Sequence, residues 1–165
     1  MSIIATDLDG TIFKGQTLID GVKEGLLKII NEGIEIYYTT NNSSQTPSEI
    51  KDKLENLLQL DIDISKIITP LVIFQNLYSD DKLNIFIYGS ENLKKYIKNL
   101  NMNVTSLENA ELVLIGRKEE NNFSEINEII KSVSIGKNIL SLNKDLTFPT
   151  EFGEMAGNGA VVKII

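Results

Sequence analysis

The sequence of 165 residues contains neither histidine nor cysteine. Their absence excludes Ser-His-Asp and Cys-His catalysis, thiolate chemistry, and the usual nitrogen and sulfur ligands of zinc. It also excludes disulfides, which fits a reducing compartment, so we expect a cytoplasmic protein. Any chemistry must therefore rest on carboxylates, lysines, hydroxyls and a metal ion held by oxygen atoms.

Long hydrophobic runs are missing as well, and the first residues carry no basic region followed by an apolar segment. The formal net charge of -7 disfavours polyanionic ligands. We therefore expect neither a membrane nor a nucleic acid as partner. The hydrophobic content of 42% is that of a globular chain with a real core, long enough for one ordinary domain or two small ones.

Short apolar runs alternate with helical patterns along the chain. The expected strands are 3–5, 34–38, 84–88, 112–115 and 139–142, and the expected helices are 20–33, 46–60, 91–100, 123–133 and 159–165. Asp20 is predicted to cap the first helix, and Thr46 with Pro47 to begin the second. This alternation predicts an α/β fold with parallel sheets, in which ligands bind beyond the carboxyl ends of the strands. A second α/β unit is expected to start near Pro70.

The first strand runs into the segment Asp-Leu-Asp-Gly-Thr at 7–11. Side chains two residues apart project to the same side of an extended segment, so Asp7 and Asp9 should face one reaction space while Leu8 turns into the core. Two adjacent carboxylates repel each other and favour the binding of a hard divalent cation that prefers oxygen ligands, and we expect this ion to be Mg²⁺. Asp7 is then suited to attack phosphorus and Asp9 to serve as general acid and base, while Thr40 and the amide of Asn41 hold phosphoryl oxygens.

Other interpretations of these segments are weaker. A turn without chemistry would explain the Asp-Leu-Asp-Gly tetrapeptide alone, but its position at a strand end favours a site. An EF-hand alignment puts Ala5 and Gln16 at the terminal ligand positions, and no Gly-x-x-x-x-Gly-Lys-Ser/Thr segment occurs. Gly153, Gly157 and Gly159 lack the Rossmann spacing, so we predict a structural loop there.

The 7–11 segment together with Tyr-Thr-Thr-Asn-Asn-Ser-Ser-Gln-Thr-Pro at 38–47 resembles the haloacid dehalogenase superfamily. More narrowly it resembles the class IIA phosphatases, the p-nitrophenyl phosphatase-like and sugar-phosphatase branch. Segments 113–116, 142–145 and 147–150 resemble strands and loops of that branch's cap domain. The resemblance implies the N-terminal half of a Rossmann-like parallel-sheet core in residues 1–69 and an α/β cap domain in 70–165.

The same resemblance implies roles for individual residues. Asp7 would be the nucleophile, Asp9 the acid and base, and both would be Mg²⁺ ligands. Thr40, Asn41 and Asn42 would form the phosphate-binding loop. Asn143 and Asp145 are candidates for contact with a small phosphorylated metabolite such as a sugar phosphate.

Three features of the chain depart from the family. The cap loop usually written Asn-Pro-Asp is Asn143-Lys144-Asp145, and Arg117 stands where an acidic residue often follows the glycine. The family's later phosphate-neutralising lysine and Gly-Asp segment have no counterpart, since Lys137 and Lys163 lie in the cap-like unit.

We therefore expect a chain truncated after the cap domain, with the C-terminal half of the core absent, and weakly active or inactive as a hydrolase. A non-catalytic remnant that binds a phosphorylated ligand or a protein partner is one alternative. A phosphotransferase is another, because an aspartyl phosphate can pass its phosphoryl group to an acceptor other than water.

Overall fold

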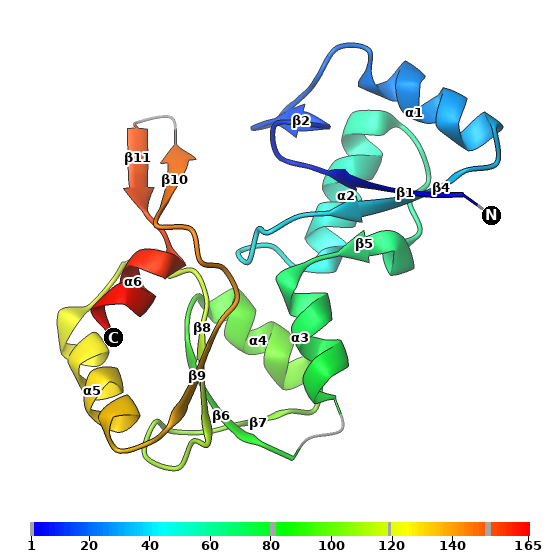
Figure 1. Ribbon diagram of the computed structural model, residues 1–165. Helices are drawn as coiled ribbons and strands as arrows, with labels where there is room; N and C mark the ends of the chain where they lie inside the picture. Colours follow the sequence, from blue (N-terminus) through cyan, green and yellow to red (C-terminus); the bar gives the residue numbers. More distant parts are fainter. Residues whose placement is uncertain (1, 80–81, 119, 151–152) are drawn as a thin grey trace. The chain divides into compact units, whose positions relative to one another are not determined.

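The structure is a computed structural model that describes residues 2–79, 82–118, 120–150 and 153–165. The chain divides into two compact units, Met1–Ile73 and Phe74–Ile165. Both units are drawn in Figure 1. Each is an α/β unit built on its own parallel sheet, so the predicted fold class is confirmed.

The first unit is built on a three-stranded parallel sheet of order β1-β4-β5. Its elements are β1 (Ile3–Asp7), β2 (Phe13–Lys14), β3 (Thr17–Leu18), α1 (Val22–Asn31), β4 (Glu35–Thr39), α2 (Pro47–Leu58), a 3₁₀ helix η1 (Ile64–Lys66) and β5 (Ile67–Ile68), and α3 (Pro70–Tyr78) begins in it. β1 pairs with β4 in a register that runs from Ile3 opposite Glu35 to Asp7 opposite Thr39. The two strands therefore end side by side, as Figure 1 shows.

The core of the first unit is apolar and continuous from the first loop to α2. Its buried residues are Leu8, Ile12, Phe13, Leu26, Ile36, Tyr38, Ile50, Leu54, Leu58, Ile62 and Ile67. Helix α2 contributes Ile50, Leu54 and Leu58, which recur every fourth residue and so form one apolar stripe. The predicted start of this helix is confirmed, because Thr46 accepts a hydrogen bond from the Glu49 N–H and the Glu49 carboxylate accepts one from the Thr46 N–H.

Two details of the first unit differ from the expectation. Asp20 does not cap α1: the N-cap is Gly21, which adopts a left-handed φ of 79° and makes no side-chain capping hydrogen bond. The chain enters this helix through a turn in which the Val22 N–H donates to the Ile19 carbonyl, so Asp20 lies one residue too early. Strand β5 was not predicted, because two residues are too few to show a period.

The second unit is built on a four-stranded parallel sheet of order β7-β6-β8-β9. Its elements are β6 (Asn84–Tyr88), α4 (Glu91–Asn99), β7 (Asn103–Val104), β8 (Leu112–Ile115), α5 (Phe123–Ser134), β9 (Asn138–Ser141), the antiparallel hairpin β10 (Thr147–Thr150) with β11 (Gly153–Ala156), and α6 (Asn158–Ile164). From β6 the chain first passes outward to β7 and then back to β8 on the other side. A parallel sheet that changes direction in this way has a switch point between the two strands, here between β6 and β8.

Helices cover both faces of this second sheet, as Figure 1 shows. On one face α5 and α6 bury Ile126, Ile129 and Val161 against Tyr88, Val113 and Ile115 of the sheet. On the other face α4 buries Leu93 and Ile97. Every residue of β8 is buried, as expected for a central parallel strand. No helix in the described ranges is long and apolar enough to span a bilayer.

Candidate active site

The candidate site lies at the carboxyl ends of β1 and β4. Asp7 is the last residue of β1, and its partner in the register is Thr39, the last residue of β4. The Thr39 hydroxyl donates to the Thr6 carbonyl at 3.0 Å, which fixes the two strand ends together. The polar loops that follow the two strands therefore start at neighbouring points of one sheet edge.

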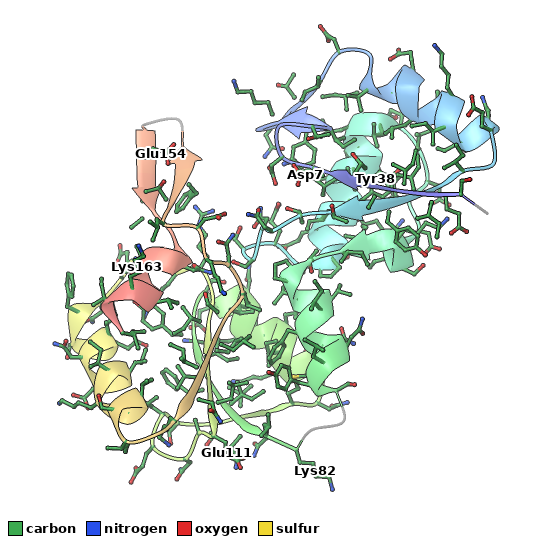
Figure 2. The ribbon with its side chains drawn as sticks, viewed as in Figure 1. Asp7, Tyr38, Lys82, Glu111, Glu154 and Lys163 are labelled. Atoms are coloured by element: carbon green, nitrogen blue, oxygen red, sulfur yellow. The ribbon has the colours of Figure 1, made fainter. Side chains whose placement is uncertain are left out.

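The end of β1 and the loop that follows it present two exposed carboxylates. Leu8 is only 1% exposed, whereas Asp7 and Asp9 on either side of it are exposed, so the predicted alternation is confirmed. The Leu8 carbonyl accepts from the N–H groups of three residues, Thr11, Ile12 and Phe13. Figure 2 labels Asp7 at the end of β1. One buried residue thus anchors the loop while its neighbours face solvent.

Gly10 allows this loop to turn back on itself. Its φ is +85°, a left-handed conformation that glycine adopts without steric cost. The Gly10 N–H donates to the Phe13 carbonyl at 2.7 Å, and Asp9 and Phe13 are paired in an isolated bridge. The Thr11 hydroxyl lies 3.5 Å from Asp7 Oδ2, a long contact for a hydrogen bond between oxygens. The shape of the turn is therefore set mainly by its backbone hydrogen bonds.

Thr40 connects the two loops. It is 9% exposed, and its N–H donates to the Ile68 carbonyl at 3.1 Å, which ties the end of β4 to β5. The Thr40 hydroxyl lies 3.4 Å from Asp9 Oδ2 and accepts from the Asn42 N–H at 3.0 Å. The structure thus brings together Asp9, Thr40 and Asn42, three of the residues that the sequence assigned to the site.

The rest of the second loop holds Asn42 in place. The Asn42 side-chain carbonyl accepts from the Ser44 N–H at 2.8 Å and from the Ser44 hydroxyl at 2.6 Å, and its amide group donates to Gln45 at 3.3 Å. The Asn42 side chain therefore shapes the turn that leads into α2. Asn41, between Thr40 and Asn42, is exposed on the same loop.

One charged residue near this site was not anticipated from the sequence. Lys53 of α2 places its ammonium 3.6 Å from the centroid of the Phe13 ring. Burial lowers the pKa of Lys53, and the nearby Asp9 carboxylate opposes this shift. Lys53 follows Ile50 by three residues, so the helical period brings it near the buried stripe, but nothing in the sequence shows that the stripe faces the Asp9 loop.

The donor set at the strand ends suits a hard cation in part. Asp7 and Asp9 are exposed carboxylates from one loop, and Mg²⁺ is typically bound by one or two protein carboxylates together with waters. In the described residues no group of three or more acidic, histidine or cysteine side chains could hold a metal ion. Asp7 and Asp9 are the carboxylates at these strand ends that would hold such an ion, with waters as its other ligands.

The two substrate candidates of the second unit lie together in the loop after β9. The Asn143 side chain accepts from the Asp145 N–H at 2.5 Å, and its amide group donates to Asp145 Oδ2 at 3.2 Å. The Ser141 hydroxyl donates to the Asn143 carbonyl at 2.5 Å. These bonds fix the shape of the loop at the carboxyl end of β9.

Gly157 and Gly159 donate backbone hydrogen bonds to the residues at the end of this loop. The N–H groups of Gly157 and Gly159 donate to the carbonyls of Leu146 and Asp145 at 2.8 and 2.9 Å. The expectation of a single structural loop is therefore wrong in its secondary structure, because Gly153 begins β11, Gly157 is the N-cap of α6 and Gly159 lies in its first turn. The expected structural role holds for Gly157 and Gly159, whose N–H groups are bonded within the chain.

A pocket opens at the switch point of the second sheet. Its volume is about 390 Å³, and its lining residues are Gly89, Ser90, Glu91, Asn92, Lys118 and Glu120. The Ser90 hydroxyl accepts from the Leu93 N–H and so caps α4, while Lys118 pairs with Glu125. Its lining residues include both acidic and basic side chains.

Comparison with known proteins identifies the family. A model of the haloacid dehalogenase-like hydrolases matches residues 4–103, more than half of the chain. The acid sugar phosphatase of Staphylococcus haemolyticus (strain JCSC1435) is 30% identical over 161 residues, which cover 96% of this chain and 61% of that protein. The chain belongs to the haloacid dehalogenase-like hydrolase family, as its two motifs predicted.

Solved structures share the fold. The p-nitrophenyl phosphatase from Archaeoglobus fulgidus matches with a TM-score of 0.89 and 22% identity, over 99% of this chain and 62% of that one. The glycerol phosphate phosphatase of Mycobacterium tuberculosis, solved in complex with magnesium, matches with a TM-score of 0.83 and 23% identity, over 99% of this chain and 50% of that one. At these identities the two structures show that the fold is shared. The chain spans about three fifths of the length of the curated relatives it matches.

Proposed function

We propose that this chain carries the nucleophilic part of a magnesium-dependent phosphomonoester hydrolase that acts on a small phosphorylated metabolite such as a sugar phosphate. The observation that carries the proposal is the β1–β4 register, in which Asp7 ends β1 opposite Thr39, with the Asp9 carboxylate 3.4 Å from the Thr40 hydroxyl. The names of the relatives, acid sugar phosphatase and p-nitrophenyl phosphatase, supply the class of substrate.

The residues suggest a double-displacement mechanism. An Asp7 carboxylate oxygen attacks phosphorus, the bond to the leaving alcohol breaks, and Asp9 donates a proton to the alcohol oxygen. Asp9 then takes a proton from water, which attacks the aspartyl phosphate and releases inorganic phosphate and the Asp7 carboxylate. A bound Mg²⁺ would supply charge neutralisation between the carboxylates and the phosphoryl group. Thr40, Asn41 and Asn42 are proposed to hold the phosphoryl oxygens.

We also propose how the function is divided along the chain. Residues 1–69 would belong to the phosphatase core, and residues 70–165 would form its cap, in which Asn143 and Asp145 contact the substrate. The composition supports a cytoplasmic protein without a nucleic-acid partner.

The test uses the chain as it is. The purified protein is incubated with p-nitrophenyl phosphate or a sugar phosphate, with and without Mg²⁺, quenched in acid and analysed by peptide mass spectrometry. We expect one added phosphoryl group on the peptide that contains Asp7, only when Mg²⁺ is present. Phosphorylation on another peptide, or hydrolysis that a chelator does not reduce, would overturn the proposal.

Thr40 gives a prediction within the phosphate loop. Thr40→Val removes the hydroxyl that contacts Asp9 and accepts from the Asn42 N–H, and leaves that N–H without its partner. We expect a loss of about 1–3 kcal/mol in the free energy of unfolding of the first unit, together with weaker binding of inorganic phosphate. Urea unfolding followed by circular dichroism measures the first effect and calorimetry the second. Thr40→Ser keeps the hydroxyl and should retain both properties, so equal losses in the two variants would contradict this role.

A second candidate function is binding of a phosphorylated ligand without turnover. It needs only the contacts among Asp9, Thr40 and Asn42 and no nucleophile. Under this alternative the acid-quenched chain gains no phosphoryl group, yet wild type and Asp7→Asn bind a sugar phosphate equally well. Transfer of the phosphoryl group from Asp7 to an added alcohol rather than to water would instead indicate a phosphotransferase.

A further inference from the structure

Lys53 is half-buried over an aromatic ring rather than extended into solvent. Its ammonium is 3.6 Å from the centroid of Phe13, a residue that is only 2% exposed. Within the described part of the chain, the ion pairs of α2 are made by Lys51, which contacts Glu55 and Asp61. Lys53 therefore gives up solvation for contact with a π face, which attracts cations more strongly when water is excluded.

Phe13 is the residue at which the Asp9 loop closes. The Phe13 carbonyl accepts from the Gly10 N–H at 2.7 Å, and the Phe13 N–H donates to the Leu8 carbonyl at 3.2 Å. Asp9 is paired with Phe13 in the bridge across this turn. A group that holds the Phe13 ring consequently holds the backbone that carries Asp9.

The charge of Lys53 also acts on the site. Burial lowers the pKa of Lys53, and the attraction of the Asp9 carboxylate acts against this effect. The ammonium lies over the Phe13 ring and Asp9 is bridged to the same residue, so the two opposite charges lie beside one residue. A cation at this position offsets part of the negative potential of Asp7 and Asp9, which would otherwise repel a phosphate.

We propose that Lys53 is a positioning residue of the phosphoryl-transfer site: its ammonium clamps Phe13 and so fixes the loop that carries Asp9, and it counterbalances the Asp9 carboxylate. Its meaning for catalysis rests on the proposed function. The clamp itself is a property of the first unit.

Two measurements on the 165-residue chain test this role, and neither needs metal or phosphate. The first is hydrogen exchange of the Gly10 amide in wild type, Lys53→Met and Lys53→Arg. Methionine removes the charge and keeps the length, and we expect exchange about threefold to tenfold faster. Arginine keeps the cation over the ring, so exchange should stay within about twofold of wild type. Lys28→Met, at an exposed position of α1, makes the same charge change and should have no effect on Gly10.

The second measurement is a double-mutant cycle of the unfolding equilibrium with Lys53→Met and Asp9→Asn. We expect the two substitutions to be non-additive by about twofold or more in the unfolding constant, because each removes one of the two opposite charges that lie beside Phe13. A lysine that served only to fill space would give additive effects and would not be rescued by arginine. Unchanged Gly10 exchange in Lys53→Met, or additivity in the cycle, would overturn the proposal. Since Asp7 phosphorylation is measured separately, each proposal can fail while the other stands.

Discussion

Replacing Asp7 by asparagine is expected to reduce Mg²⁺-dependent phosphoryl transfer by about 1,000-fold or more. A carboxylate oxygen can attack phosphorus, whereas an amide of the same shape is a poor nucleophile and a weaker ligand for a hard cation. Because we expect the chain itself to be weakly active, the first measurement is the fraction of chains with a phosphoryl group on the peptide of residue 7 after acid quenching. The second is the release of p-nitrophenol. Both should fall below detection in the variant.

The control for Asp7→Asn is Asp52→Asn. Asp52 is exposed on α2 in the same unit, so the variant makes an equal change in net charge away from the strand ends. It should keep wild-type activity. Because Asp7 is exposed at the end of β1, Asp7→Asn should also leave the thermal unfolding of the chain nearly unchanged. Retention of a tenth or more of the wild-type rate by Asp7→Asn would remove Asp7 from the mechanism.

The site residues in the first unit were predictable because parallel strands impose their geometry. Once residues 3–5 and 34–38 are recognised as neighbouring parallel strands, their carboxyl ends must meet at one edge. The buried Leu8 between exposed Asp7 and Asp9 then follows from the two-residue period of an extended chain. The chemistry assigned to these residues remains a prediction.

Features that depend on tertiary packing could not be predicted in this way. Strand β5 has two residues, which show no period of their own. Lys53 has the pattern of an ordinary surface lysine on an amphipathic helix, and its position over Phe13 depends on how α2 packs against the first loop. The Gly21 cap is another case, since a left-handed turn replaced the side-chain cap that Asp20 suggested.

The second large effect is expected at Gly159, where alanine should destabilise the second unit by about 3 kcal/mol. A Cβ at Gly159 would lie 2.0 Å from the Lys144 carbonyl oxygen and 2.5 Å from its carbon. These atoms belong to the backbone of the 143–145 loop, so no side-chain rotation relieves the overlap. Because the Gly159 N–H also donates to the Asp145 carbonyl, the loop and the start of α6 must move apart together.

Gly25→Ala is the comparison for Gly159→Ala, and we expect it to change the free energy of unfolding in the opposite direction. Gly25 lies within α1, and a Cβ there would have no heavy atom within 4 Å. Alanine at an open helical position should stabilise the first unit by about 0.5–1 kcal/mol. Glycine is replaced by alanine in both variants. The comparison therefore separates the stabilisation from reduced backbone entropy at Gly25 from the destabilisation by steric overlap at Gly159.

Hydrogen exchange of amides in β8 reports the Gly159 effect on the second unit, and amides in β4 report the Gly25 effect on the first. Gly159→Ala should also raise the exchange rates of amides in the 143–145 loop, because the hydrogen bonds from Gly157 and Gly159 hold that loop in place. If Gly159→Ala leaves the exchange rates of β8 amides unchanged, the backbone of Lys144 can move away from residue 159 at little cost in stability. The loop with Asn143 and Asp145 would then be able to change shape, instead of presenting a fixed surface to the substrate proposed to bind there.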